Sequence, residues 1–272
     1  MTLKVFQAPH LGRTVKLGRR RPISHGPRLS LKNYLDMSKI PPAPDCDYTS
    51  AAQPGLSDVL LNDRLGDCTC AGIGHVIDLV NCNAGTIVRV TDDQVLALYE
   101  AACNYNPNDP SSDQGGDEPT VLNYMADKGL DGNGLHKFVG SINVDACNQA
   151  EVRWAQWALG NLYFGEEMPE DYVDPFPSGS GFVWDVAGES DPDNGHCFVG
   201  CGSNSQGVII DTWGLLGIQT YAAIGKYAMR SSNGELHSIL TKEWLNSATQ
   251  KTPSGFAYND LVSDLRAIGA LI

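Results

Sequence analysis

Long apolar runs are missing from this chain of 272 residues. The longest runs are a handful of residues, whereas a membrane-spanning helix needs roughly 20. No apolar block follows the basic residues of the first 40 positions, so a secretory signal peptide is not predicted. We therefore expect a protein without a transmembrane segment, in the cytoplasm or associated with a virion.

Basic residues are scarce after position 45. Residues 1–45 hold nine of the 19 Lys and Arg and only two acids, a net charge of +7, and residues 46–272 carry −20. Such an acidic body repels nucleic acid and anionic membranes, so neither is expected as its partner. The basic segment 1–45 is expected to lie on that body or to bind a protein assembly partner, and alone it could bind nucleic acid.

The order of the sequence patterns indicates an α+β protein. Residues 1–57 are expected to be a basic extended N-terminal arm. Residues 58–272 are expected to form one domain, with 58–165 mainly helical and 166–272 mainly strands plus a C-terminal helix. Helical patterns cover residues 68–80, 91–102, 119–128, 149–159 and 259–268, and strand patterns cover 181–187, 197–201, 208–212 and 221–229.

Thr91 and Gln94 form a capping-box pattern at the start of the second of these helices. The acid cluster of Glu166, Glu167, Glu170 and Asp171 is expected on a solvated face, and His237 on the surface.

Eight cysteines are present, but without a signal peptide a disulfide framework is not the default. A zinc site is an alternative for some of them, because thiolates and imidazole are suitable ligands. Its spacings match no established zinc pattern, so no metal or organic cofactor is expected. The candidate zinc ligands are Cys68, Cys70, His75 and Cys82.

Cys68 lies where a loop turns into a small-residue helix, and a helix N-terminus favours a thiolate. A thiolate needs an imidazole to exchange its proton, and His196 stands at the entrance of an apolar strand. Asp211 ends the next strand, so we expect it to accept the second imidazole N–H and fix the tautomer.

These segments together resemble the papain-like cysteine peptidases, and they occur in the family's order over residues 55–230. The family carries Gln six residues before its nucleophile, and Asn62 holds that place here. The family's His-Ala-Val strand is similar to the run from His196 to Gly202, and its Asn-Ser-Trp-Gly to the run from Asp211 to Gly214. The helix starts at Thr91 and after Gly115-Gly116 are also similar.

The resemblance implies a papain-like fold, in which a central helix after Cys68 packs against an antiparallel sheet or barrel. It implies a hydrolase that cleaves peptide or isopeptide bonds in a protein or peptide substrate through a thioester. Cys68 would attack, His196 would move the proton, Asp211 would orient His196, and Asn62 with the Cys68 backbone N–H would bind the oxyanion.

Alternatives remain open at this point. Asp211 replaces the family's Asn, and Asn62 is one methylene shorter than Gln. Cys70 is a rival nucleophile, although the six-residue spacing favours Cys68. The same triad also serves deamidation and acyl transfer. A papain-fold structural or binding protein of a larger assembly, such as a virion, is the other class.

Overall fold

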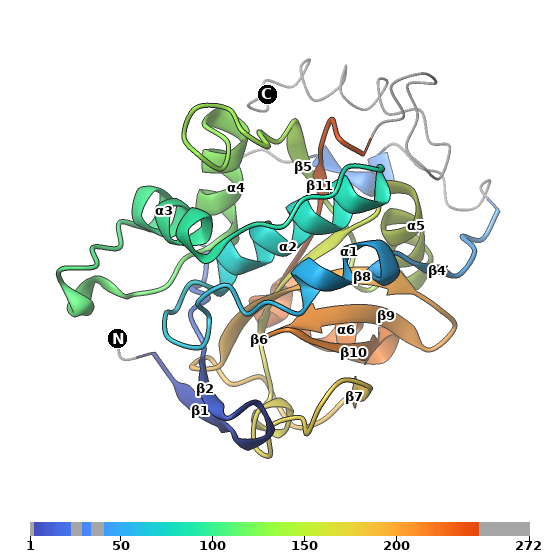
Figure 1. The fold of residues 1–272 in the computed structure, drawn as a ribbon. Coiled ribbons are helices and arrows are strands. Elements are labelled where there is room, and N and C mark those ends of the chain that lie inside the picture. The colour runs from blue at the N-terminus through green and yellow to red at the C-terminus, as the bar shows by residue number, and fades with distance from the viewer. Residues whose placement is uncertain (1–2, 23–28, 34–40, 245–272) are drawn as a thin grey trace.

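The computed structural model describes residues 3–22, 29–33 and 41–244 (Figure 1). The terminal helix predicted over residues 259–268 lies outside this part of the chain. Within it, no helix is long and apolar enough to cross a membrane.

One mixed sheet holds nine of the strands and forms the centre of the fold. Most neighbouring strands are antiparallel, and the pairs β3–β5 and β10–β7 are parallel. Its order is β3 (Leu29–Ser30), β5 (Gly140–Asn143), β11 (Glu235–Leu240), β6 (Leu162–Glu167), β8 (Gly195–Ser203), β9 (Gly207–Thr212), β10 (Leu215–Thr220) and β7 (Phe182–Trp184), and β4 (Cys46–Asp47) pairs with β8.

Helices cover both faces of this sheet. The helices are α1 (Thr49–Leu56), α2 (Cys68–Asn83), α3 (Asp92–Cys103), α4 (Glu118–Asp127), α5 (Gln149–Leu159) and α6 (Tyr221–Tyr227). Short 3-10 helices span Pro9–Leu11, Leu31–Asn33, Pro110–Ser112, Glu170–Tyr172 and Arg230–Ser232.

Side chains alternate along β8 and divide the core in two. Cys197 and Val199 belong to a cluster with α2, α3 and α4, whereas Phe198 belongs to a cluster with α5 and α6. In Figure 1, α2 runs across the sheet, and α3 and α4 lie beside α2. The predicted α+β fold with a central helix after Cys68 is confirmed.

Local signals placed several helix ends correctly. The Thr91 side chain accepts from the Gln94 amide, and the Gln94 side chain accepts from the Thr91 amide, so the capping box forms. The helix predicted over 149–159 is α5, and Gly160, the residue that follows its end, has a φ of 78°. Glycine adopts that left-handed conformation without a Cβ clash.

Three sequence expectations are wrong. The strand predicted over 221–229 is instead α6, whose first turn is capped by the Thr220 hydroxyl. Glu166 and Glu167 are buried in β6, whereas Glu170 and Asp171 of the same acid cluster are exposed as expected, and His237 is buried in β11. Partners distant in the sequence explain the burial of these acids, since Glu166 accepts from the side-chain amide of Gln219 and Glu167 pairs with Arg21. Such long-range partners leave no local sequence signal.

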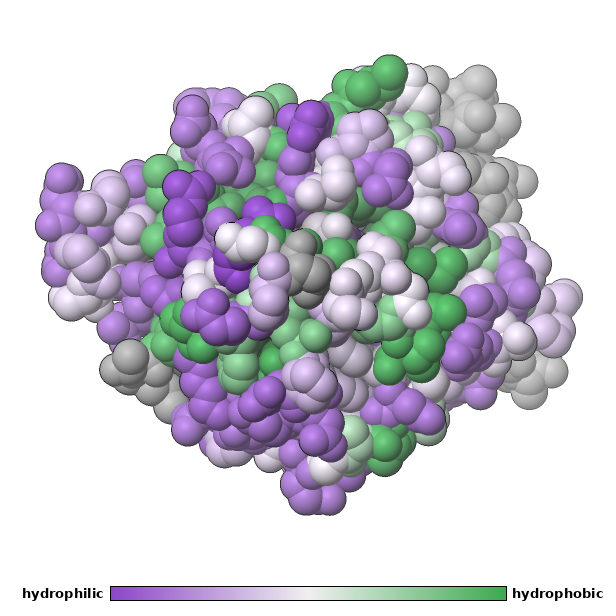
Figure 2. All heavy atoms as spheres, turned by 60° about the horizontal axis from the view of Figure 1, so that its bottom comes forward, coloured by the Kyte–Doolittle hydropathy of each residue, from purple (hydrophilic) through white to green (hydrophobic). Residues whose placement is uncertain are grey.

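The segment expected as an extended arm contains structure of its own. Strands β1 (Val5–Ala8) and β2 (Arg13–Lys16) form an antiparallel hairpin. Ala8, Val15 and Leu17 are buried in the same cluster as α5. Figure 2 shows the side of β1, β2 and β7, where hydrophilic residues make up much of the surface and hydrophobic ones form smaller groups.

Ion pairs join this basic segment to the acidic body. Arg13 pairs with Asp63, and five further pairs link a residue before position 22 to a carboxylate beyond position 110, so the segment is held on its own body. The pairs are Lys4 with Asp191, Lys16 with Asp113, Arg19 with Glu118, Arg20 with Asp117 and Arg21 with Glu167.

Leu17→Ala tests whether the arm is part of the core. Leu17 is 1% exposed, so we expect the substitution to lower the free energy of unfolding by about 2–4 kcal/mol. Val5 on the same hairpin is 52% exposed, and Val5→Ala should cost less than about 0.5 kcal/mol. Urea unfolding of the full chain measures both. Equal small effects would mean that the arm is not part of the cooperative core.

Candidate active site

The Cys68 thiol lies at the first residue of α2 and is 1% exposed. Burial raises its pKa above the usual range, and nearby acids, Glu118 and Asp67, raise it further. The backbone amides of Cys197 and Gly18 act in the opposite direction and favour the thiolate. Cys197 directly follows His196 in the chain, but among the described residues no hydrogen bond joins the Cys68 thiol to the His196 ring.

The His196 ring is held on one side and unpaired on the other. Its Nε2 lies 2.8 Å from the Thr212 hydroxyl oxygen, and the Trp213 ring stacks on it with centroids 4.0 Å apart. Among the described residues, Nδ1 has no hydrogen-bond partner. If Nε2 carries the proton and donates it to Thr212, Nδ1 keeps a lone pair that can take up another proton. Burial lowers the pKa of His196 to about 3.

The structure directs Asp211 away from His196. Asp211 lies opposite Val199 in the β8–β9 ladder, and its Oδ2 is 3.4 Å from Nδ1 of His75 on α2. Burial raises the pKa of Asp211 and lowers that of His75 to about 4. Successive side chains of a strand point to opposite faces, so Asp211 faces α2 while Thr212 faces His196. The predicted contact between Asp211 and His196 is replaced by the contact with Thr212.

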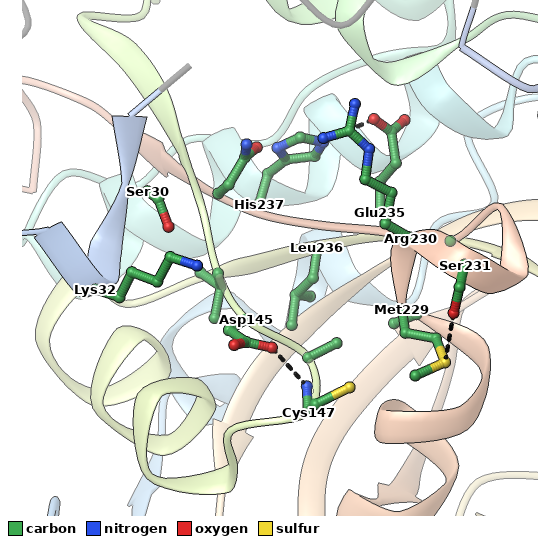
Figure 3. A pocket seen from close by; sticks show the side chains of 15 residues that line it. Ser30, Lys32, Asp145, Cys147, Met229, Arg230, Ser231, Glu235, Leu236 and His237 are labelled. Carbon is green, nitrogen blue, oxygen red and sulfur yellow. Dashed lines mark hydrogen bonds and ion pairs between the residues drawn. The ribbon is translucent and has the colours of Figure 1, made fainter. Parts of the chain in front are cut away.

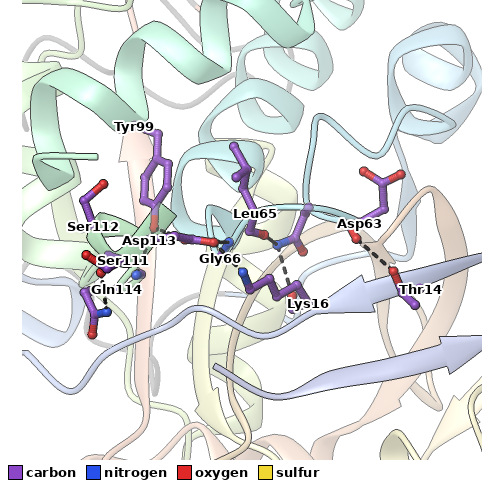
Figure 4. Close-up of polar contacts among 12 residues, drawn as sticks. Thr14, Lys16, Asp63, Leu65, Gly66, Tyr99, Ser111, Ser112, Asp113 and Gln114 are labelled. Atoms are coloured by element: carbon purple, nitrogen blue, oxygen red, sulfur yellow. Dashed lines mark hydrogen bonds and ion pairs between the residues drawn. The ribbon is translucent and has the colours of Figure 1, made fainter. Parts of the chain in front are cut away.

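Asn62 lies in the loop before α2 and holds the N-terminal arm. Its Nδ2 donates to the backbone carbonyls of Lys16 and Leu65, each at 3.1 Å, and its own carbonyl accepts from the Lys16 amide. Figure 4 shows the Lys16 side chain beside Asp113, which also accepts from the Gly66 amide. The amide expected to bind an oxyanion is thus engaged by the arm.

Residues 16–20, which we call the covering segment, continue from this contact across the site. Gly116 donates its amide to the Gly18 carbonyl at 2.9 Å, and the Arg20 amide donates to the Gly116 carbonyl at 2.7 Å. The Arg19 amide donates to the carbonyl of Gly195, the residue before His196. Gly195 has to be glycine for this approach, because a Cβ there would overlap the Arg19 carbonyl.

Cys70, the alternative nucleophile, and the other candidate zinc ligands, His75 and Cys82, each contact a different partner. The Cys70 thiol lies beside that of Cys103, and Cys82 donates to the Val88 carbonyl. His75 faces Asp211. In the described part of the chain, no three His, Cys, Asp or Glu side chains converge as metal ligands.

A pocket of about 540 Å³ lies elsewhere, between β5, β11 and the segment after α6 (Figure 3). Charged side chains of both signs line it, among them Lys32, Asp145, Arg230 and Glu235. None of the predicted site residues belongs to its lining.

Sequence reasoning missed Thr212, Gly116 and Gly195 as parts of this region. For Thr212 a signal existed, because strand alternation allows only one of two successive residues to face His196. The two glycines contact the arm through backbone atoms, which have no residue-specific pattern.

Comparison with known proteins supports the fold. No family model and no curated protein matches the chain. Solved structures do match. Xylellain, a cysteine protease from Xylella fastidiosa, is 13% identical with a TM-score of 0.57 over 89% of this chain and 99% of that one. Procathepsin L2 proteinase from the Tenebrio molitor larval midgut is 14% identical with a TM-score of 0.56 over 82% and 77%.

The Amb a 11 cysteine protease of ragweed pollen, in its proform, is 13% identical with a TM-score of 0.52 over 82% of this chain and 75% of that one. At these identities the comparison concerns the fold. The papain-like fold predicted from the sequence is confirmed.

Thr212→Val and Asp211→Asn separate the two assignments of the His196 partner. We expect Thr212→Val to shift the ring ¹⁵N resonances of His196, because the hydrogen bond to Nε2 is lost. Asp211→Asn should shift those of His75 and leave His196 unchanged. Nuclear magnetic resonance of the full chain measures both. A shift of His196 in Asp211→Asn alone would reinstate Asp211 as its partner.

Proposed function

We propose that this chain is a cysteine hydrolase that cleaves peptide or isopeptide bonds through a thioester. One observation carries the proposal. The Nε2 of His196 contacts the Thr212 hydroxyl, whereas its Nδ1 has no hydrogen-bond partner within the described structure. The backbone amide of the next residue, Cys197, favours the thiolate of Cys68. The fold shared with cysteine proteases supports the same reaction class.

In the proposed reaction, Nδ1 of His196 takes the thiol proton and the Cys68 sulfur attacks the substrate carbonyl carbon. The resulting oxyanion is bound by the Cys68 backbone N–H and by Asn62. The imidazolium returns its proton to the leaving amine as the C–N bond breaks, which leaves a thioester. Water, deprotonated by His196, then hydrolyses the thioester and restores the thiol.

Thr212 holds the imidazole in this scheme, and Asp211 has a positioning part. Asp211 Oδ2 lies 3.4 Å from His75 Nδ1, so Asp211 packs the strand that carries Thr212 against the helix that begins with Cys68. No metal or organic cofactor is needed for any step.

We further propose that the covering segment keeps the site inactive. Burial raises the pKa of Cys68 and lowers that of His196, so thiol and imidazole are both neutral while the segment is in place. Both backbone groups of Gly18 are engaged in this position, because its carbonyl accepts from the Gly116 amide and its amide favours the thiolate of Cys68. Its ion pairs with the body favour this role over binding an assembly partner.

Covalent labelling tests the nucleophile and the cover. In a Cys147→Ser background, which removes an exposed thiol, we expect an epoxide probe to label Cys68 slowly at pH 7. Lys4→Ala with Arg21→Ala removes two partly exposed ion pairs and should raise the rate roughly threefold to tenfold. Peptide mapping by mass spectrometry locates the modification.

His196→Ala is the control for activation and should lower the labelling rate of Cys68 in both backgrounds. If the rate is the same with and without His196, the proposed base is not His196. If another cysteine is labelled faster than Cys68, the nucleophile is misassigned.

Asn62→Ala has two opposite effects under this proposal. It removes a bond to the covering segment, so labelling of Cys68 should become faster. It also removes an oxyanion donor, so kcat on a peptide amide should fall by about 10²–10³ with little change in KM. Asn62→Gln is the companion that restores a longer amide. Faster labelling with unchanged kcat would leave Asn62 as a holder of the arm only.

A further inference from the structure

Glu166 is a fully buried acid that lies directly opposite His196. It stands on β6, and its Cα is the partner of the His196 Cα in the antiparallel β6–β8 ladder. Residues that oppose each other in such a ladder point to the same face of the sheet, with their Cβ atoms about 4.5–5.5 Å apart. Glu166 is 0% exposed and His196 is 1% exposed. A carboxyl group and the imidazole therefore share one face of the sheet, away from water.

Gln219 of β10 fixes the carboxyl group of Glu166. Its Nε2 lies 2.9 Å from both carboxyl oxygens, and Gln219 is itself buried. In the sheet order, β8 and β9 stand between β6 and β10, so this side-chain contact crosses the inner side of a curved part of the sheet. The amide donor favours the ionised form of Glu166, because it donates to a carboxylate.

Three other ionisable groups surround Glu166 in the described part of the chain, and they are Arg19, Tyr172 and Tyr227. Both tyrosine hydroxyls donate to backbone carbonyls. The Arg19 guanidinium lowers the pKa of Glu166, but it belongs to the covering segment. Once that segment is displaced, His196 is the ionisable group opposite Glu166 that can become a cation.

An imidazolium at His196 and a carboxylate at Glu166 would stabilise each other. In the covered chain, burial lowers the pKa of His196 to about 3 and raises that of Glu166 to about 8, so both groups are mainly neutral at pH 7. The proposed reaction puts a proton on His196. That cation lowers the pKa of the opposing carboxyl group, whose proton passes to water. The carboxylate in turn raises the pKa of His196 by the same amount, because coupling between two sites is reciprocal.

We propose that Glu166, held by Gln219, is a positioning residue that stabilises the His196 imidazolium, and through it the Cys68 thiolate, during the reaction. The inference rests on the proposed hydrolase function. It gives a reason for burying an acid, because an apolar residue of similar volume would fill the same place without the loss of hydration. Thr212 contacts the ring at Nε2 and Glu166 supplies the opposite charge, so the two residues have separate parts.

The pH dependence of Cys68 labelling tests this proposal in the Cys147→Ser, Lys4→Ala and Arg21→Ala background. Opening of the epoxide probe uses the thiolate as nucleophile and the imidazolium as acid, so the rate should be highest between two pKa values. Glu166→Gln should lower the upper pKa by about one pH unit, because the imidazolium loses its opposite charge. The rate at the pH of the original upper pKa should fall by about fivefold to tenfold. Ring ¹⁵N resonances of the imidazole measure the same pKa directly.

Glu151→Gln is the matched control. Glu151 is also a buried acid, but it lies on α5 and accepts from the Asp145 amide, so its substitution should leave the upper pKa unchanged. Gln219→Leu is the second variant. It removes the donor that favours the carboxylate, so the upper pKa should fall here as well. Thermal melting checks that each variant folds, and Gln219→Leu decides the test if Glu166→Gln does not unfold cooperatively.

The outcomes separate this proposal from the hydrolase function. If labelling depends on His196 but the upper pKa is the same with and without Glu166, the part assigned to Glu166 is wrong and the hydrolase function stands. Equal shifts in Glu166→Gln and Glu151→Gln would also overturn it, because they would reflect the charge of the whole protein. If Cys68 is labelled in none of these variants, the hydrolase function fails, and the part of Glu166 in it fails too.

Discussion

The buried ion pair between Arg19 and Glu118 connects the parts of this molecule that matter for its chemistry. A charge buried at this depth is stable only with a close partner, so Arg19, Glu118 and Glu235 have to meet in the folded chain. Their meeting fixes the path of the N-terminal arm over the start of α4 and the end of β6. The backbone bonds to Gly116 and Gly195 follow from that path, and they bring the covering segment over Cys68 and His196.

Charge and backbone complementarity act together in this arrangement. The arm is basic and the body is acidic, so they attract each other, but this attraction does not fix which arm residue lies against which body residue. The register comes from short-range contacts: the bond of Asn62 to the Lys16 carbonyl, and the close approach at Gly195. Salt should weaken the exposed pairs of Lys4 and Arg21 much more than the buried pair of Arg19, because screening acts mainly on exposed charges. The exposed pairs are therefore the natural place to loosen the cover.

Buried histidines make the fold sensitive to acid. His196 and His75 have pKa values lowered by burial to about 3 and about 4, below the value of about 6.5 in an unfolded chain. Between pH 6.5 and pH 4 the unfolded chain binds more protons than the folded one, so these two groups reduce stability as the pH falls through that range. Buried acids act oppositely: Glu166, with a pKa raised to about 8, favours the fold at low pH and loses that contribution as the pH rises through 8.

The sequence by itself determined the α+β class, the helix that begins at Cys68, the capping box at Thr91 and the strand that carries His196, because each depends on neighbours within a few residues. It also indicated the chemical types, a thiol and an imidazole. The tertiary structure decided which residue holds the imidazole, since the choice between Asp211 and Thr212 depends on the face each presents in the β8–β9 ladder. It also decided that the arm lies against the candidate site and that Arg19 meets Glu118 across 99 positions. Contacts between distant residues arise only when the whole core packs, so no local pattern announces them.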